Sequence, residues 1–501
     1  RYLIQNYILN NIWRIIKLSK PLHKWIYLIF GLSIFYGALQ LATPLLTQQM
    51  TAVVEQQITD GDAEIQRLYW LFGAVFIVGI VGAALNSVQQ RIGDHFGGEI
   101  RRYLTEVFYD HIFTLPQKFF DTELSGKIIN QLNRGIVSVE QFLKTASNFI
   151  FPTFVQTIFT FIVLFIVSWP VALFLLILFP IYTYLSYLSA KQWGEEEKKK
   201  NKHEDITRGR IQEVISNMKL VKGFINQVSE WKFISKELVS INNIYARQSN
   251  AFHRFDFLRN LSLQVILVLV YIVIFTQTFN GVYGIDELVL LLQLVFSLQR
   301  PLFVMSFILS QIQTTESGTK EFFEILDLPS DEEYKKESKI MDEHINKLSF
   351  DSVSFEYDKA DEDVLKDLSL TINNREKVAL VGHSGAGKST IINLIAKFYK
   401  PTEGEIYINN HAYSELTHND VRGLISLVFQ ENELFSTTVR ENVAYGMDVS
   451  DEEVEEALKQ ANAWNFVSKF DKGIKTKVGE RGIRLSGGQK QRIQIARAFL
   501  H

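Results

Sequence analysis

The stretch GHSGAGKST, Gly382–Thr390, carries the residues with the clearest chemistry in the chain. It has the glycine spacing and the final Lys-Ser pair of a P-loop. Glycines let backbone amides curl around phosphate oxygens, the lysine reaches the β- and γ-phosphates, and the serine hydroxyl ligates Mg²⁺. The apolar run Lys377–Val381 predicts a buried strand before the loop, and apolar residues at helical spacing from Ile391 to Phe398 predict a helix after it. The sequence therefore predicts a site for nucleotide phosphates at a helix N-terminus.

A second motif, LSGGQ, lies at Leu485–Gln489 and opens a helix-like run that continues to Leu500. Its glycines and Ser486 would lie at a helix N-terminus, another position that favours anions. The two motifs together resemble those of ATP-binding cassette (ABC) proteins, in which LSGGQ is the signature. The resemblance covers nearly the whole chain and implies ATP and Mg²⁺ as the bound species.

The resemblance also implies roles for individual residues. Tyr357 resembles the aromatic residue that stacks on adenine, and Gln430 resembles the Q-loop glutamine that senses Mg²⁺ and the attacking water. Gln430 follows Ile425–Phe429, which is predicted to be an apolar strand, and Val478–Gly482 resembles the loop that precedes the signature in exporter-type members. The implied ATP-binding residues are Tyr357, Gly382, His383, Ser384, Gly385, Ala386, Gly387, Lys388, Ser389 and Thr390; the implied Mg²⁺ ligands are Ser389 and Gln430; and the implied contacts to a partner chain's ATP are Leu485, Ser486, Gly487, Gly488 and Gln489.

The catalytic glutamate and the switch histidine of the family have no counterpart that we can assign in this sequence. In the family they follow an apolar strand after the signature, and no such run lies between Gln489 and His501. Glu431 and Glu433 are interpreted as surface residues of the loop after Gln430 and not as substitutes for the base. We therefore expect the sequence to be a truncated form of a longer protein, with an incomplete α/β P-loop NTPase domain that does not hydrolyse ATP alone.

The 501 residues divide into an apolar first part and a soluble-looking second part. A bilayer span needs about 20 mostly apolar residues, and six segments of the first part meet this length. The net charge of −3 gives no basic field for nucleic acid, and the absence of cysteine excludes disulfides. The six predicted spans are Trp25–Met50, Leu68–Val88, Phe149–Val167, Val171–Leu188, Leu261–Phe279 and Leu288–Ile312.

Loop charges predict how the spans are oriented. The segment 56–66 carries Asp60, Asp62 and Glu64 without Lys or Arg, whereas the opposite ends of the spans carry clusters such as Lys198–Lys200. The positive-inside rule places the basic ends in the cytosol, so both termini are expected there, in the cytoplasmic membrane. Tyr7–Leu18 is amphipathic and is expected to lie along the inner surface as an elbow helix, although a plain surface helix fits the pattern equally well.

Two long polar connections, Gln89–Asn148 and Ala190–Asn260, are expected to be helical extensions in the cytosol. By resemblance they carry coupling helices that dock into nucleotide domains, which we place near Thr122–Ile129 and Phe224–Glu230. The predicted organisation is a transmembrane domain over residues 1–316, a charged linker over 317–346 and the truncated cassette over 347–501. The expected fold class is thus an all-α six-span domain followed by an α/β domain.

The resemblance implies an exporter-type half-transporter that acts as a dimer with a second copy or a paralogue, since only one P-loop is present. Each ATP would lie between Lys388 of one chain and Ser486 of the other. Two alternatives stay open: a non-catalytic, regulatory or conduit-like half of a heterodimer, and an importer on the same scaffold.

The substrate is expected to be an amphipathic drug, lipid or peptide. Neutral polar residues in the spans suit such ligands, although glutamines also hydrogen-bond between membrane helices. Arg300 lies within the sixth predicted span and is a candidate cavity residue for an anionic head group, with a bond to local carbonyls or to the interface as the alternative. The neutral polar residues are Gln40, Thr43, Gln156, Gln264 and Gln293.

Overall fold

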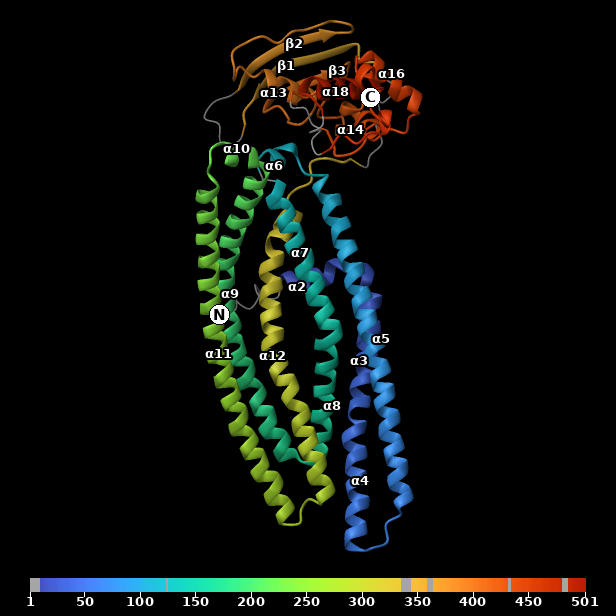
Figure 1. Cartoon of the computed structure of the whole chain (residues 1–501), viewed down its shortest axis with the longest axis vertical. Helices are drawn as coiled ribbons and strands as arrows, with labels where there is room; N and C mark the ends of the chain where they lie inside the picture. Colours follow the sequence, from blue (N-terminus) through green and yellow to red (C-terminus); the bar gives the residue numbers. More distant parts are fainter. Residues whose placement is uncertain (1–9, 123–124, 335–343, 358–363, 431–433, 480–484) are drawn as a thin grey trace. The chain divides into compact units, whose positions relative to one another are not determined.

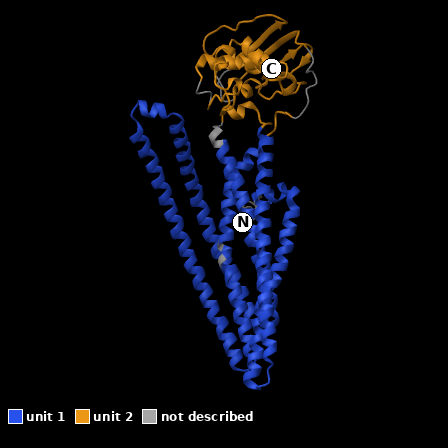
Figure 2. Cartoon of the chain, turned by 45° about the vertical axis from the view of Figure 1, so that its right-hand side comes forward, with its two compact units in different colours: residues 1–112, 123–328 blue, residues 113–122, 329–501 orange. Residues whose placement is uncertain are grey.

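The computed structural model describes residues 10–122, 125–334, 344–357, 364–430, 434–479 and 485–501. Their contacts divide the chain into two compact units (Figure 2). The first unit holds residues 1–112 and 123–328, and the second holds residues 113–122 and 329–501. The short segment 113–122 therefore belongs, by its contacts, to the unit that carries the nucleotide motifs.

The first unit is built from long helices that follow the apolar runs of the sequence (Figure 1). Six helical stretches are long and apolar enough to cross a membrane, and each contains one of the six predicted spans, so the six-span prediction is confirmed. The helices are α2 (Asn10–Leu18), η1 (Lys20–Leu22), α3 (His23–Gln40), α4 (Ala42–Thr59), α5 (Ile65–Ile112), α7 (Ser125–Thr145), η2 (Ala146–Ile150), α8 (Phe151–Val167), α9 (Trp169–Ser216), α10 (Met218–Gly223), α11 (Gln227–Phe279) and α12 (Ile285–Leu326).

Three details of this unit differ from the expected pattern. The elbow helix α2 starts at Asn10, and residues 7–9 lie outside the described part of the chain. The first span is interrupted at Leu41, between α3 and α4, near Pro44, which has no backbone N–H for the helix ladder. At the start of the third span, Ala146–Ile150 form one π-helical turn between α7 and α8.

Mostly aliphatic side chains of α8, α9, α11 and α12 form a buried core cluster, which includes Leu175, Leu267 and Leu294. In the polar helical extensions, small residues allow two helices to approach closely. A Cβ added at Gly135 of α7 would lie 2.5 Å from the Cβ of Phe322 in α12. Glycine is therefore needed at this position for the approach of the two helices.

The two short helices in the long connections lie earlier than predicted. The helix α6 covers Gln117–Thr122, whereas Thr122–Ile129 was predicted; Glu123 and Leu124 lie outside the described residues, and α7 starts at Ser125. The helix α10 covers Met218–Gly223, and the predicted segment Phe224–Glu230 is instead a turn followed by the start of α11. Ile225 of this turn has a φ of 54°, a left-handed conformation that ends the helix, and this turn geometry was not visible in the pattern.

In the second unit, a four-stranded antiparallel sheet has the order β2-β1-β3-β4. The helix α12 covers the first ten residues of the predicted linker, and the sheet begins at Lys347. The elements are α6 (Gln117–Thr122), β1 (Lys347–Phe355), β2 (Leu365–Asn373), α13 (Lys388–Ile395), β3 (Glu403–Ile408), β4 (His411–Ala412), α14 (His418–Arg422), α15 (Val439–Val443), α16 (Asp451–Gln460), α17 (Trp464–Val467), η3 (Gly473–Lys475) and α18 (Gly487–Leu500).

The prediction of buried strands at 377–381 and 425–429 is wrong for this structure. Both segments lack strand pairing in the part of the chain that the structure describes. Val381 is 89% exposed, and Phe429 is 50% exposed. A strand is stabilised by the hydrogen bonds of a neighbouring strand and by cover on its faces. An apolar run alone provides neither the neighbouring strand nor the cover. It indicates only that the residues favour a strand, not that a strand forms.

Candidate functional site

The P-loop adopts the tight geometry that its glycines predict. Gly385 and Gly387 have φ values of 85° and 80°, and α13 begins directly after them at Lys388. A Cβ at Gly387 would lie 2.6 Å from Leu365 Cδ2 and would push this side chain aside, and the positive φ of Gly387 itself disfavours any other residue. The loop thus presents a helix N-terminus to solvent, which is the arrangement that binds phosphate.

The ammonium group of Lys388 is held by the loop itself. Its Nζ donates to the carbonyl oxygens of Gly382, at 2.9 Å, and His383, at 2.6 Å. These carbonyls hold the ammonium at the mouth of the loop, and phosphate oxygens are acceptors of the same kind with more negative charge. The donor set of the loop therefore fits a nucleotide phosphate.

Tyr357 lies next to the loop but is also a packing residue. Its hydroxyl is 3.2 Å from the hydroxyl oxygen of the buried Thr390. Its ring makes edge contacts with Phe355, at 4.7 Å, and Tyr399, at 5.2 Å between centroids. Tyr357 is half-exposed and lies beside the P-loop residue Thr390. Stacking on adenine stays a prediction.

The signature motif forms the start of α18 through a reciprocal cap. The Ser486 hydroxyl accepts from the Gln489 backbone N–H at 3.3 Å, and the Ser486 N–H donates to Gln489 Oε1 at 2.9 Å. This is a capping box, in which two residues satisfy each other's backbone donors. Leu485 is buried, whereas Ser486, Gly487 and Gly488 are exposed. The serine–glutamine spacing could have predicted this cap from the sequence.

The two anion-binding helix starts belong to different hydrophobic cores. Ile391 and Leu394 of α13 pack with the sheet, including Phe350 and Ile406. Leu485 and Ile493, at and after the signature, pack instead in a helical core with Val454. P-loop and signature are thus held by separate cores of the same unit.

Ser389 and Gln430 fit the oxygen ligands that Mg²⁺ prefers. Both are exposed, and among the described residues neither side chain has a hydrogen bond. Glu431 and Glu433, and residues 480–482 of the predicted loop before the signature, lie outside the described part of the chain.

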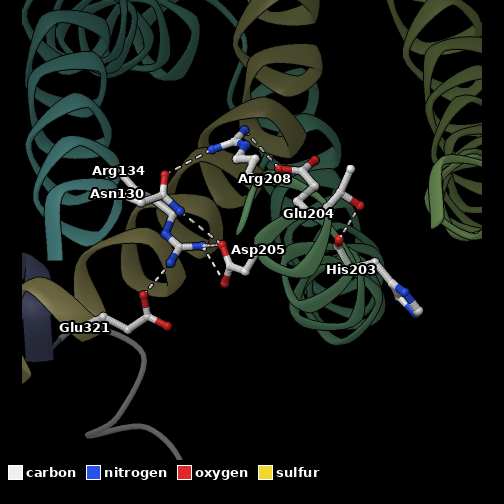
Figure 3. Close-up of polar contacts among 8 residues, drawn as sticks. Asn130, Arg134, His203, Glu204, Asp205, Arg208 and Glu321 are labelled. Atoms are coloured by element: carbon white, nitrogen blue, oxygen red, sulfur yellow. Dashed lines mark hydrogen bonds and ion pairs between the residues drawn. The ribbon is translucent and has the colours of Figure 1, made fainter. Parts of the chain in front are cut away.

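In the first unit, a charged network joins α7, α9 and α12 (Figure 3). Asp205 of α9 accepts from Asn130 Nδ2 at 3.1 Å and from Arg134 Nη1 at 3.2 Å. The same Arg134 also bonds Glu321 of α12, and Arg208 donates to Asn130 Oδ1 at 3.2 Å. The network therefore fixes three helical extensions to one another through side chains from each.

The far end of the α9–α11 hairpin is clamped by a second ion pair, next to α10, where Figure 1 shows the two long helices side by side. Arg210 of α9 holds both carboxylate oxygens of Glu230 of α11, with Nε 2.7 Å from Oε2. The Glu230 carboxylate is buried, but the side chains of Phe224 and Ile225 beside it are 78% and 84% exposed. The clamp holds an exposed apolar tip in place.

Two arginines in or near the spans, Arg300 and Arg259, have opposite surroundings. Arg300, the predicted cavity residue, is exposed, with its guanidinium 5.8 Å from the ring centre of Phe149. Arg259, which the sequence analysis did not single out, is fully buried between the rings of Tyr182 and Phe252. Asp256, three residues earlier, pairs with it at 3.2 Å and was the signal available in the sequence.

Comparisons with known proteins agree with this architecture. The family model described as ABC transporter transmembrane region matches residues 26–302, and the model described as ABC transporter matches residues 365–501. The domain of the second model binds ATP.

Two curated relatives and one solved structure illustrate the similarity. The uncharacterized ABC transporter ATP-binding protein YwjA of Bacillus subtilis (strain 168) is 30% identical over 432 residues, 85% of this chain and 74% of that protein. The ATP-dependent lipid A-core flippase of Pseudoalteromonas translucida (strain TAC 125) is 29% identical over 469 residues, 91% of this chain and 78% of that protein.

The solved structure is a bacterial Atm1-family ABC exporter with ATP bound. It aligns with a TM-score of 0.84 at 22% identity, covering 96% of this chain and 84% of that chain. With six membrane helices and one ATP-binding cassette in a single polypeptide, the chain belongs to the ABC transporter family and has the fold of an exporter half-transporter.

Proposed function

We propose that this protein is an ATP-driven exporter of an amphipathic drug, lipid or peptide, and that it works as a dimer of half-transporters in the cytoplasmic membrane. The observation that carries the proposal is the pair of helix starts at the two motifs, at Lys388 and at Gly487, in a chain that also has six spans. The relatives named as a lipid A-core flippase and as an Atm1-family exporter support export.

The proposed dimer is supported by how the two motifs are held. Because α13 and α18 pack in different cores, the P-loop and the signature of one chain have no common core between them. Two chains placed head to tail bring the P-loop of one against the exposed Ser486 of the other. Lys388 then compensates the β- and γ-phosphate charge, and the start of α18 presents backbone N–H groups to the γ-phosphate.

Mg²⁺ would be held by the Ser389 hydroxyl and the Gln430 amide oxygen, and when bound it neutralises charge on the phosphate oxygens. Gln430 directly follows the apolar segment 425–429, and its proposed role is to respond to changes at the phosphates. The basic ends of the spans are proposed to face the cytosol, which places the nucleotide unit on the side that holds ATP.

Coupling to the spans is proposed to run through α6 and α10. In the second unit, Asp121 at the end of α6 hydrogen-bonds Tyr399, and the Thr114 carbonyl accepts from the Asp331 N–H at 2.8 Å. These bonds attach the segment 113–122 to the nucleotide-bearing residues. A change at the P-loop can therefore move this segment and the helices on either side of it.

The proposal is tested with two variants that each break one half of the composite site. In Lys388→Ala the phosphate loses its ammonium partner, and in Ser486→Arg a bulky charge occupies the signature. Each variant alone should lack ATP-dependent uptake of a fluorescent phospholipid into inside-out vesicles. Co-assembled variants keep one intact site, between the Lys388 of one chain and the Ser486 of the other, and should regain part of the uptake.

Two results would contradict this reading. Full ATP turnover by isolated monomers would exclude composite sites. ATP-dependent uptake into right-side-out vesicles with none into inside-out vesicles would establish import in place of export.

A further inference from the structure

A hollow of about 160 Å³ lies between the first and second spans, where α3 and α4 run beside α5 (Figure 1). Its polar lining comes from Tyr36, Gln40 and Thr43 on one side and Asn86 on the other. All four belong to the predicted spans, so the hollow opens within the depth of the membrane. One buried water needs only about 10–15 Å³ of such space, so the hollow has room for a group much larger than water.

Two features of the backbone create this space. The first span breaks at Leu41, between α3 and α4, and Pro44 leaves the Gln40 carbonyl without its usual i+4 donor. Opposite the break, α5 presents Gly79 and Gly82. A Cβ added at Gly79 would meet nothing within 4 Å, and one at Gly82 would first meet Leu39 Cδ2 at 3.8 Å. Larger residues would fit at these positions, so the hollow is not a consequence of close packing.

The polar side chains that line the hollow are not used for helix–helix bonds. Among the described residues, the Tyr36 hydroxyl, the Gln40 amide and the Thr43 hydroxyl have no hydrogen bond, and the Asn86 Oδ1 accepts only a long one, at 3.4 Å, from Gln90. By contrast, Gln89, the first residue after the second predicted span, does bridge helices. Gln89 donates to both the Ser33 hydroxyl and the Ser147 carbonyl at 3.0 Å.

Unpaired polar groups at membrane depth are costly, so they require a partner that is itself polar. None of the residues that line the hollow is charged. A charged head group would lose its hydration there without gaining an ion pair, whereas a hydroxyl or an amide can both donate to and accept from these side chains. The lining therefore favours a head group that forms hydrogen bonds and carries no charge.

We propose that this hollow binds the uncharged, hydrogen-bonding head of an amphipathic molecule, a hydroxyl-bearing or amide-bearing group, with its hydrocarbon part in the surrounding apolar surface. The inference rests on the proposed export function, because it identifies the bound molecule as cargo. It differs from the Arg300 prediction, which called for an anionic head group at the sixth span.

The test uses the cysteine-free chain with one introduced thiol. Ala83→Cys places a small reactive group on the wall of the hollow, and the full chain is placed in lipid nanodiscs. The rate of reaction with N-ethylmaleimide is measured with three amphiphiles that share a dodecyl chain: dodecyl maltoside, dodecyl phosphate and dodecyltrimethylammonium. We expect dodecyl maltoside to slow the labelling several-fold more than the two charged amphiphiles do.

Variants then identify the residues responsible. Gln40→Leu and Asn86→Leu should each weaken protection by dodecyl maltoside about threefold, the typical value of one hydrogen bond between membrane groups. Gln49→Leu is the matched control, since Gln49 is an exposed glutamine of α4 outside the hollow and should leave protection unchanged.

Equal protection by all three head groups, or protection unaffected by both lining variants, would overturn the proposal and leave a water-filled hollow only. The labelling needs no nucleotide. A negative result together with intact ATP-dependent uptake would therefore reject this site and leave the export function standing, whereas lost uptake with selective protection would do the reverse.

Discussion

In the nucleotide-bearing unit, Lys388 and Ser486 of the two motifs bond within their own loops, whereas in the helical unit Arg134 bonds across helices. Lys388 is held by carbonyls five and six residues before it, and Ser486 by Gln489 three residues after it. Arg134, by contrast, joins residues far apart in the chain, Asp205 and Glu321. A locally bonded, exposed group can exchange its partner for a ligand, and a group bonded between helices cannot do so without moving them.

This difference predicts that variants of the locally bonded groups change ligand binding with little effect on stability. Variants of groups bonded between helices should lower stability with little effect on ligand binding. The Lys388 and Glu230 variants below test this prediction directly, and the Gly135 and His418 variants compare packing and burial in the same two units. They are given from the largest expected effect to the smallest.

Lys388→Ala should lower the affinity for a fluorescent ATP analogue by at least about a hundredfold, because each charge-assisted hydrogen bond contributes about 1.5–3 kcal/mol and the lysine supplies two. Its thermal unfolding midpoint should stay near that of the unchanged protein. Lys377→Ala, an exposed lysine just before the loop, is the control and should bind normally. Unchanged affinity in Lys388→Ala would defeat the P-loop assignment.

Gly135→Ala should destabilise the helical unit by about 1–3 kcal/mol, the usual cost of overpacking. The new methyl group would lie 2.5 Å from the Cβ of the buried Phe322, so α7 and α12 must separate. Thermal unfolding in detergent measures the effect. Gly209→Ala has open space around its Cβ and should be neutral or slightly stabilising, since alanine favours helix. Equal midpoints for the two variants would mean that the helices are not in contact at Gly135.

Glu230→Leu should loosen the tip of the α9–α11 hairpin, because Arg210 loses the carboxylate that both orients it and neutralises it. A cysteine introduced at position 225, in the turn before α11, should then react faster with a thiol reagent. ATP binding should stay normal. Glu204→Leu removes a more exposed pair, with Arg208, and should have a smaller effect. The double variant Arg210→Glu with Glu230→Arg should restore slow labelling, and failure of both the loss and the rescue would reject the clamp.

His418 should make the nucleotide-bearing unit less stable in acid. Burial lowers the pKa of this imidazole; Glu332 and Asp331 oppose the shift, and Arg422 and Lys397 add to it. Since the folded state binds the proton less well than the unfolded state, stability is complete above the unfolded pKa of about 6.5 and falls as the pH drops below it. Unfolding midpoints across this range should flatten in His418→Asn but not in the exposed control His344→Asn. An unchanged slope in His418→Asn would assign the acid sensitivity elsewhere.

The local geometry of the two motifs was largely predictable from the sequence, because each motif bonds mainly within its own loop. The P-loop needs a strict order of glycines because two of them take positive φ angles, at Gly385 and Gly387, and a short motif records this requirement directly. The cap at Ser486 and Gln489 is equally local. The spans were readable for a similar reason, because the length of an apolar run reflects the thickness of the membrane.

Other features could not be predicted from the sequence because they depend on the parts of the chain that pack or pair with them. The segments 377–381 and 425–429 have the composition of buried strands, but strand formation requires paired neighbours. The short helices α6 and α10 depend on turns, such as that at Ile225, whose backbone angle no apolar pattern reports. The same holds for the burial of Arg259 between two aromatic rings, one of which lies on another helix.

The sequence by itself therefore determined the class of the protein: a P-loop motif and a signature motif with fixed spacing, six spans and no cysteine. Only the tertiary structure decided which polar side chains are committed to structure and which are free to bind. Gln40 lies in the first span and Gln89 directly after the second, and they are the same residue type, yet Gln89 bridges three helical segments and Gln40 faces the hollow unpaired. The physical reason is that a hydrogen bond needs a partner within about 3 Å, and the partner is supplied by the packing of helices and not by the residue itself.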